Sequence, residues 1–370
     1  MKRFLLPLVL AGLLLDAHFA VAQARRTSST ARKKAAKRTV KPPPPVDPTL
    51  GDDVDGDDLT VRRAAVAALG TTNGSVVVAD PATGRILSFV NQKLGLKAGF
   101  TPCSTIKLVT ALAALNEHIV ERDTNVRLSR YVSFNLTTAI AHSNNPYFAT
   151  LGNRLGFDRV THYAQMLGLG EKAGLDISGE QPGSIATEPP KYGGVGLMTS
   201  FGEGFLVTPL ELAGLLSAIA NGGTLYYLQY PRSTDEIDHF TPRVKRPIEV
   251  APSDIEDIKV GMRGAVDFGT ARRAGYDATE PILGKTGTCT DFNSSSHMGW
   301  FGSFNEVGKH QLVVVVMLAA VNKSVSGPVA AGVAGAIYRN LSEQRYFAMD
   351  SPDGRPTLPQ IITTTPCCPK

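Results

Sequence analysis

The sequence predicts an α+β fold in which helices flank an antiparallel sheet and also form a mostly helical subdomain. Two observations carry this prediction. Apolar runs of strand length lie at both ends of the region 61–345, whereas runs with helical periodicity fill its middle. No segment of the chain repeats at a fixed period, so a solenoid or propeller is not expected.

The composition is that of a globular protein with a large core. Hydrophobic residues make up 43% of the 370 residues and charged residues 19%, against a usual charged share of about 25%. These proportions exclude a fully disordered chain and a coiled coil. The net charge is +5, but residues 61–370 carry 28 basic and 26 acidic side chains, so no surface for nucleic acid is expected.

Residues 1–24 are typical of an export signal, or of a short membrane anchor that is not cleaved. Lys2 and Arg3 precede the apolar run 4–15, and Ala22-Gln23-Ala24 fits a cleavage site. The run would reach only about 18 Å as a helix, short of the ~30 Å core of a bilayer. We therefore expect a protein of the periplasm or cell envelope.

Residues 25–60 are expected to form a disordered tether. A basic block, four consecutive prolines and an acidic run follow one another, with few apolar side chains to offset the entropy of ordering. The basic block could contact anionic lipid or cell-wall polymer, although a solvated spacer is the simpler interpretation. Residues 346–370 are rich in Pro and Thr and are expected to form a second loose tail, which leaves 61–345 as the folded domain.

The elements of the domain follow from local patterns. Asp58 is expected to cap a first helix that ends at Gly70. The strands 75–79 and 86–90 are expected to form a hairpin around the turn 80–84. Further helices are expected at 105–115, 136–142, 209–220 and 330–341, and further strands at 298–304 and 312–319.

The first candidate motif is Ser104-Thr105-Ile106-Lys107, at a helix start. The spacing of three residues puts the Lys107 ammonium beside the Ser104 hydroxyl on one helix face. A desolvated lysine near other cations loses basicity, so it can exist as the neutral amine that accepts a serine proton. Taken alone, the pair is equally typical of an ordinary exposed helix start.

Two further motifs combine hydroxyls, amides and charge. Ser143-Asn144-Asn145 follows the expected helix 136–142, where a hydroxyl could relay a proton and an amide could orient a peptide bond. Lys285-Thr286-Gly287-Thr288 would suit an edge strand that binds a peptide carboxylate. Each motif alone is also typical of a helix end or a strand end.

In this order, S-x-x-K, S-x-N and K-T-G form the signature of the active-serine penicillin-recognising enzymes. The region 61–345 resembles the transpeptidase domain of penicillin-binding proteins, and the resemblance implies their β-lactamase/transpeptidase-like fold. It implies no cofactor and no metal; the 7 His and 4 Cys show no zinc-binding spacing either. Four further segments support the resemblance. Residues 73–91 resemble the family's opening strands and 143–156 its S-x-N helix. Residues 208–223 resemble its most recognisable non-catalytic stretch and 327–331 the entry to its C-terminal helix.

The resemblance also implies a role for each motif residue. Ser104 would attack the carbonyl of the D-Ala-D-Ala bond in a peptidoglycan stem peptide and form an acyl-enzyme. Lys107 would accept the serine proton, and Ser143 with Lys285 would pass a proton to the departing D-alanine. β-Lactam antibiotics would acylate Ser104 in the same way.

Substrate contacts are implied by the same resemblance. Asn145 would hold the substrate amide, and Thr286 and Thr288, on either side of Gly287, would bind the terminal carboxylate. The backbone N–H groups of Ser104 and Thr288 would form the oxyanion hole, where each donor is worth roughly 3–4 kcal/mol.

Two other functions fit the same motifs. A serine β-lactamase of class A would need a glutamate that activates water, between the second and third motifs. The E-x-x-L-N pattern of these enzymes is absent there, and Glu188 and Glu203 are candidates by location only. A sensor that is acylated by β-lactams or muropeptides without turnover is the second alternative. The choice of water or an amine as acyl acceptor stays open from the sequence, and with it the choice between carboxypeptidase and transpeptidase.

Cys103 and Cys289 stand beside the first and third motifs, which resembles the cysteine pair of some carbapenem-hydrolysing class A enzymes. An oxyanion hole made by Ser104 and Thr288 would bring these neighbours within the ~4.4–6.8 Å Cα separation of a disulfide. Export would favour the bond. The alternative is a pair of unlinked buried thiols.

Overall fold

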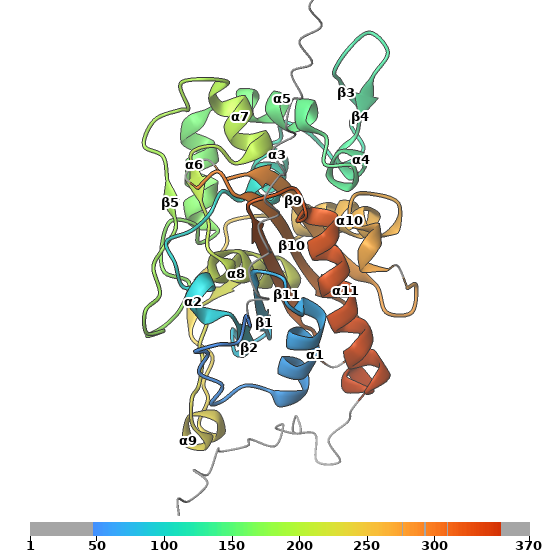
Figure 1. Ribbon diagram of the computed structural model, residues 1–370. Helices are drawn as coiled ribbons and strands as arrows, with labels where there is room; N and C mark the ends of the chain where they lie inside the picture. Colours follow the sequence, from blue (N-terminus) through green and yellow to red (C-terminus); the bar gives the residue numbers. More distant parts are fainter. Residues whose placement is uncertain (1–46, 276, 292–293, 309, 349–370) are drawn as a thin grey trace, which may run out of the picture. The chain divides into compact units, whose positions relative to one another are not determined.

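The computed structural model describes residues 47–275, 277–291, 294–308 and 310–348. At its centre is a five-stranded antiparallel sheet with the strand order β2-β1-β11-β10-β9 (Figure 1). The expected α+β fold is confirmed. The strands are β1 (Gly74–Ala79), β2 (Ile86–Val90), β9 (Ile282–Thr290), β10 (His297–Asn305) and β11 (Val313–Ala320).

Every expected strand is present within one or two residues of its predicted ends. The register pairs Val76 with Val316 and Val78 with Val314, so β-branched side chains lie opposite one another in the middle of the sheet. β9 pairs only with β10 and is therefore an edge strand, as the Lys-Thr-Gly motif predicts.

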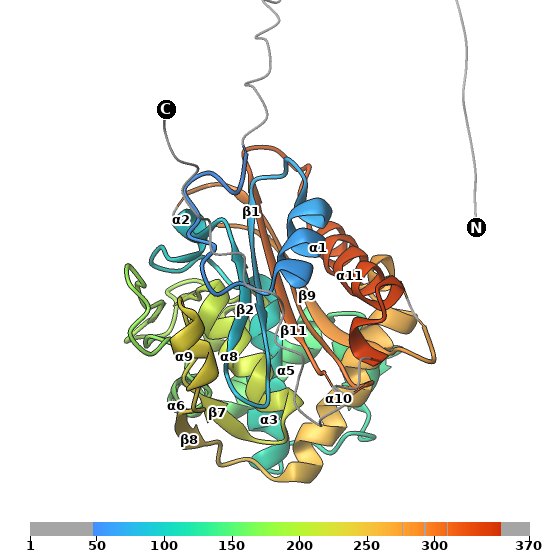
Figure 2. The same cartoon turned by 90° about the horizontal axis from the view of Figure 1, so that it is seen from below.

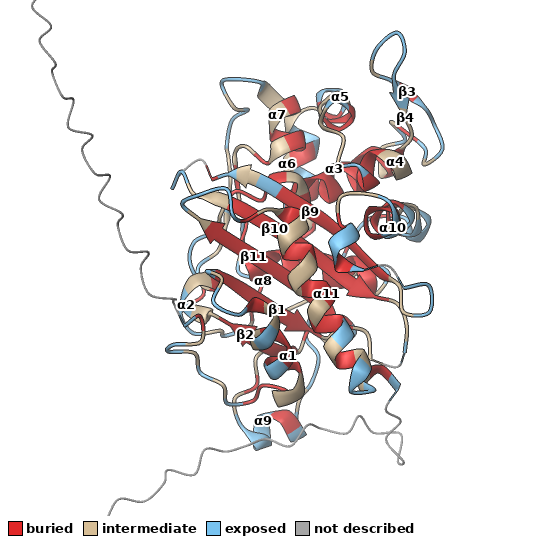
Figure 3. Cartoon of the chain, turned by 45° about the vertical axis from the view of Figure 1, so that its right-hand side comes forward, coloured by how far each residue is buried: buried red, intermediate tan, exposed pale blue. Residues whose placement is uncertain are grey.

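Two hydrophobic cores lie on the two faces of the sheet. Helices α1 (Leu59–Leu69) and α11 (Gly327–Glu343) cover one face and pack on Val76, Val316 and their neighbours (Figure 2). Helix α8 (Pro209–Ala220) covers the other face, against Val77 and Val315. Because both faces are covered, the strands are buried almost throughout (Figure 3), which explains their continuous apolar runs.

The part of the chain that the structure describes contains no helix that is both long and apolar enough to cross a membrane.

The mostly helical subdomain lies beside the α8 face. The larger helices of this region are α3 (Lys107–Asn116), α4 (Leu136–Ala141), α5 (Asn145–Leu155), α6 (Phe157–Met166), α7 (Gly194–Phe201) and α10 (Pro252–Asp267). Its small strands are β3 (Val126–Arg127), β4 (Ser133–Phe134), β5 (Ser184–Ile185), β6 (Phe205–Leu206), β7 (Thr224–Tyr226) and β8 (Val244–Pro247).

Side-chain caps fix the ends of the helices that matter for the site. Asp58 caps α1 by accepting hydrogen bonds from the backbone N–H groups of Thr60 and Val61, and Gly70 follows the helix, as predicted. Thr208 and Glu211 form a reciprocal capping box at the start of α8. Short helical turns complete the chain: α2 (Gln92–Gly95), α9 (Thr234–Asp238), η1 (Cys103–Ile106), η2 (Arg272–Ala274) and η3 (Tyr346–Ala348).

The boundaries expected for the two tails need correction. The acidic run belongs to the folded region, because Asp52 and Asp57 both pair with the Arg62 guanidinium at 2.9 Å. At the other end, Tyr346 donates a hydrogen bond to Asp58 at 2.8 Å and Phe347 is buried. Charge patterning alone misses this because it shows the aspartates but not their partner. The proposed export signal, the basic block and residues 349–370 lie outside the described residues.

Candidate active site around Ser104

The three sequence motifs meet at one place between the sheet and the helical subdomain. Ser104 lies in the 3₁₀ turn η1, and Lys107 begins α3 directly after it. The Lys107 amine lies 2.9 Å from the Ser104 hydroxyl oxygen and 3.0 Å from that of Ser143. The Lys285 amine, on β9, lies 2.8 Å from the same Ser143 oxygen. One chain of polar contacts therefore joins all three motifs.

Two residues of the site have left-handed backbone conformations that are unusual for residues other than glycine. Cys103 has φ of 53° and Ser143 has φ of 55°. Such conformations cost free energy and persist where surrounding contacts hold them. The Asn144 side chain caps α5 through the N–H of Tyr147 at 2.8 Å, so the middle residue of Ser-Asn-Asn is structural and its neighbours face Lys107.

Lys107 is the electrostatic centre of the site. Its side chain is buried, and burial together with the nearby Lys285 lowers its pKa to about 6. Two of its four partners can only accept hydrogen bonds, namely the Ser143 carbonyl at 2.8 Å and the Asn145 side-chain oxygen at 2.5 Å. A neutral amine has two N–H groups for these acceptors, which leaves its lone pair for the hydroxyl of Ser104 or Ser143.

Lys285 is the second buried amine. It donates to the Ser143 hydroxyl and, at 2.9 Å, to the Thr286 carbonyl, and burial lowers its pKa to about 7. Burial lowers the pKa of both amines, and the positive charge of Lys285 lowers that of Lys107 further, so the site favours Lys107 as the neutral amine. The arrangement can thus hold one neutral amine beside Ser104 and one charged amine on the edge strand.

The two threonines of the edge strand are tied to loops behind it. The Thr286 and Thr270 hydroxyl oxygens lie 2.6 Å apart, and the Thr288 hydroxyl accepts a hydrogen bond from the Gly327 N–H at 2.7 Å. Gly287 allows close packing, since a Cβ there would lie 2.9 Å from the Pro102 carbonyl oxygen.

Sequence reasoning missed Thr270, which links the edge strand to the helix before Ser143. Its N–H donates to the Ala141 carbonyl at 3.0 Å, and the hydroxyl reaches Thr286. The preceding residue is Gly269, where a Cβ would lie only 2.1 Å from the Ala141 oxygen. A glycine required by close approach was the only signal in the sequence, and many glycines occur without such a role.

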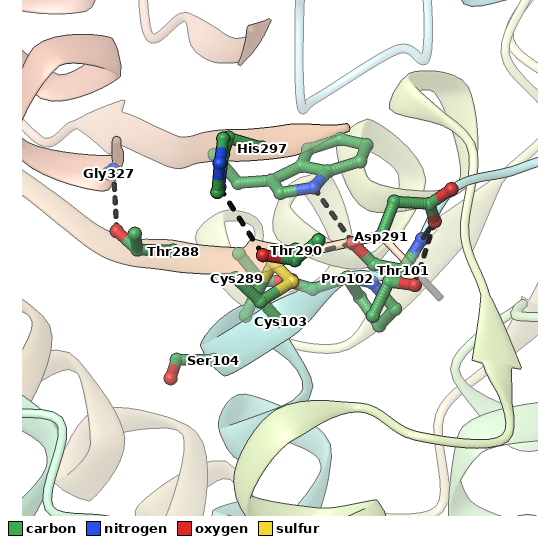
Figure 4. The surroundings of a disulfide bond; sticks show 12 residues. Thr101, Pro102, Cys103, Ser104, Thr288, Cys289, Thr290, Asp291, His297 and Gly327 are labelled. Carbon is green, nitrogen blue, oxygen red and sulfur yellow. Dashed lines mark hydrogen bonds between the residues drawn. A yellow bond between two sulfur atoms is a disulfide. The ribbon is translucent and has the colours of Figure 1, made fainter. Parts of the chain in front are cut away.

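The expected disulfide between Cys103 and Cys289 is present, with a Cα–Cα separation of 5.5 Å (Figure 4). Two unpredicted contacts support it. The Asp291 carboxylate accepts hydrogen bonds from the Thr101 N–H at 3.0 Å and hydroxyl at 2.8 Å. The Trp300 indole N–H donates to the Thr101 carbonyl at 3.0 Å. Together they fasten the segment before Ser104 to β9 and β10.

A water-activating glutamate or a metal ion would give this site a different chemistry. Within the described residues, neither Glu188 nor Glu203 makes a hydrogen bond to Ser104 or Lys107. The described ranges contain no group of three or more His, Cys, Asp or Glu side chains that could hold a metal ion.

A Ser-x-x-Lys turn facing a Lys-Thr-Gly edge strand across a Ser-x-Asn loop is the arrangement of the penicillin-recognising enzymes. The family model of the penicillin binding protein transpeptidase domain matches residues 74–339, and the chain belongs to that family. The resemblance inferred from the motifs is thereby confirmed.

Several curated proteins are similar over the same region. The chain is 29% identical to stage V sporulation protein D of Bacillus subtilis (strain 168) over 283 residues, which are 68% of this chain and 44% of that protein. It is 24% identical to the peptidoglycan D,D-transpeptidase MrdA of Escherichia coli (strain K12) over 298 residues, 64% of this chain and 47% of that protein. The chain therefore spans less than half the length of these relatives.

Solved structures share the fold. Penicillin-binding protein PBP2 of Pseudomonas aeruginosa superposes with a TM-score of 0.65 at 24% identity, over 79% of this chain and 78% of that one. The transpeptidase domain of penicillin-binding protein 3 from Burkholderia pseudomallei gives 0.65 at 20% identity, over 80% of this chain and 98% of that one.

Proposed function

We propose that this protein is a peptidoglycan D,D-transpeptidase that works through an acyl-enzyme on Ser104. The observation that carries the proposal is the buried Lys107 amine, 2.9 Å from the Ser104 hydroxyl, whose low pKa favours the neutral form. A serine is a weak nucleophile unless a base takes its proton as it attacks. The relatives named peptidoglycan D,D-transpeptidase support the choice of substrate.

In the first step, Ser104 attacks the carbonyl carbon of the D-Ala-D-Ala bond and Lys107 accepts the serine proton. The backbone N–H groups of Ser104 and Thr288 stabilise the oxyanion. The C–N bond then breaks, and the proton taken up by Lys107 passes through the Ser143 hydroxyl, which contacts both lysines, to the departing D-alanine amine. The products are an ester on Ser104 and free D-alanine.

Substrate binding uses the residues around this centre. The Asn145 side-chain oxygen is engaged by Lys107, which leaves its N–H₂ group for the substrate amide. Thr286, Thr288 and the charged Lys285 bind the terminal carboxylate, a charge-assisted contact. The Thr270 hydroxyl orients the Thr286 hydroxyl for this task.

In the second step, an amine of a neighbouring stem peptide attacks the ester and forms the cross-link, whereas water would give the carboxypeptidase product. A β-lactam would acylate Ser104 and remain attached. Rapid deacylation of the class A β-lactamase kind would need a glutamate poised at the ester, and Glu188 and Glu203 do not contact the Ser104–Lys107 pair. Such an enzyme works outside the cytoplasm, in the cell envelope, which agrees with the export signal expected in residues 1–24.

Mass spectrometry of the protein after addition of a penicillin tests the proposal. We expect a persistent adduct on Ser104, and no adduct on a Ser104→Ala variant that keeps the fold, because a small substitution in a cleft costs under about 1 kcal/mol. Rapid loss of the adduct with accumulating penicilloate would indicate a β-lactamase. Equal labelling of the Ser104→Ala variant would exclude the nucleophile. An adduct without turnover of stem peptides would indicate a sensor.

A further inference from the structure

A basic hairpin projects from the helix that ends just before Ser143. Strands β3 and β4 pair through Val126 with Phe134 and through Arg127 with Ser133. Figure 1 shows this hairpin extending beyond α4, away from the central sheet. It connects the first motif to the second along the chain, and neither motif uses it.

The tip of the hairpin has an unusual surface for a solvated loop. Tyr131 is 84% exposed and Val132 is 44% exposed, and the Arg130 guanidinium lies 5.2 Å from the centre of the Tyr131 ring. Residues 126–134 include Arg127 and Arg130 and no acidic residue. Among the described residues, neither arginine forms an ion pair. Exposed tyrosine and arginine are the side chains most enriched at binding hot spots.

The base of the hairpin is fixed to the catalytic side of the molecule. Leu136 donates its N–H to the Arg122 carbonyl at 3.1 Å, which closes the base. Asn135 caps α4 through the N–H of Thr138 at 3.0 Å, and α4 packs on α10. A ligand held at the tip would therefore have a fixed position relative to Ser143.

We propose that the hairpin tip, residues 127–132, binds a peptidoglycan strand beside the stem peptide that reaches Ser104. The inference rests on the proposed function. Stem peptides carry free carboxylates, which the forked guanidinium groups of Arg127 and Arg130 bind by paired hydrogen bonds. The exposed Tyr131 ring offers a flat apolar face for the C–H groups of a sugar ring. Two positive charges on a hairpin whose residues 126–134 include no acid favour an anionic polymer over a neutral one.

The experiment compares binding to purified insoluble peptidoglycan by co-sedimentation, in full-length chains that carry Ser104→Ala so that no chemistry occurs. The test variant is Arg127→Gln/Arg130→Gln/Tyr131→Ser. The control is Arg63→Gln/Arg345→Gln, two exposed arginines outside the hairpin that likewise form no ion pair. We expect binding about tenfold weaker for the test variant at low salt, with a smaller difference at high salt, and a change of less than about twofold for the control.

Further measurements keep the outcomes distinct. The basic block 32–41 is present in every variant, so differences between variants belong to the substituted residues. With Ser104 restored, penicillin labelling of the test variant should match that of the unsubstituted chain, because none of the substituted side chains, all of them among the described residues, is hydrogen-bonded to Ser104, Lys107 or Ser143. Unchanged peptidoglycan binding, or loss of labelling together with binding, would overturn the proposal. Co-sedimentation with phosphatidylglycerol vesicles is measured for the same variants. If the substitutions weaken binding to these vesicles but not to peptidoglycan, the hairpin binds a lipid surface and the proposal is overturned. If the unsubstituted chain is never labelled but its peptidoglycan binding depends on the hairpin, the proposed function fails and the binding site stands.

Discussion

At the residue scale, the chemistry of the site depends on which of two buried lysines is neutral. Both amines lie within hydrogen-bond distance of the Ser143 hydroxyl, so neither can be charged without affecting the other. Desolvation lowers the pKa of each, and the positive charge of Lys285 lowers that of Lys107 further. The proposed mechanism therefore uses one lysine as a base and the other as a cation in the same site.

The pH dependence of acylation should report this coupling. In the proposed mechanism the neutral form of Lys107 is the base, so the rate of labelling by fluorescent penicillin should rise as the pH increases through about 6. A Lys285→Gln variant removes the nearby positive charge, which raises the pKa of Lys107 and should move the rising limb to higher pH. Labelling of the Lys285→Gln variant should also be slower at every pH, since the substitution weakens the proposed contact with the carboxylate of the penicillin.

A Lys93→Gln variant provides the control, because Lys93 is exposed and outside the site. Its pH profile should match that of the unsubstituted protein. A rising limb at the same pH in the Lys285→Gln variant would mean that Lys285 does not set the protonation of Lys107.

At the scale of elements, the disulfide links the turn that carries Ser104 to the edge strand across 186 residues of sequence. A Cys289→Ser variant should lose up to about 5 kcal/mol of unfolding free energy on the chain-entropy model, as measured by denaturant titration. Penicillin labelling should become several-fold slower but not stop, because Asp291 and Trp300 still hold Thr101. Recovery of Cys103 and Cys289 as separate alkylated peptides from unreduced protein would contradict the bond itself.

The start of α8 depends on one buried carboxyl group. Glu211 accepts hydrogen bonds from the N–H groups of Gly170, Gly183 and Thr208, and burial raises its pKa to about 7. A Glu211→Gln variant can replace only some of these contacts, so we expect a loss of about 1–3 kcal/mol in unfolding free energy.

The pH dependence of that loss has a definite sign. Because the folded-state pKa is raised, the stabilisation by Glu211 is fully present below the unfolded pKa of about 4.5 and is lost as the pH rises toward 7. The difference between the unsubstituted protein and the Gln variant should therefore narrow between pH 5 and pH 7 in urea titrations. A Glu121→Gln variant, at an exposed position, should show no such trend.

At the scale of the whole folded region, the segment before α1 is held by a buried ion-pair cluster. The Arg62 guanidinium pairs with Asp52 and Asp57, and the carboxylates are almost completely excluded from solvent. An Arg62→Met variant leaves both charges without their partner and should lose about 3–5 kcal/mol of stability in thermal or chemical unfolding. Arg63→Met, at the exposed neighbouring position on the same helix, should change stability by less than about 0.5 kcal/mol. Equal effects of the two substitutions would show that the cluster does not stabilise the fold.

Local sequence patterns suffice to predict the strands and helices and to recognise the motifs. The valine runs of β1 and β11 and the Asp58 cap of α1 depend on local periodicity and local hydrogen bonding, so they can be predicted from short windows. The three motifs were recognisable because their residue types and spacing are specific as a set.

How these parts act together depends on contacts that form only in the folded chain. Lys285 and Ser143 are 142 residues apart in sequence, and the lowered pKa of each lysine depends on the burial of its amine in the folded protein. The roles of Thr270 and Asp291, and the ordered acidic run around Asp57, likewise depend on partners that are distant in sequence. Desolvation and long-range pairing exist only after the chain has closed on itself, so no local pattern encodes them.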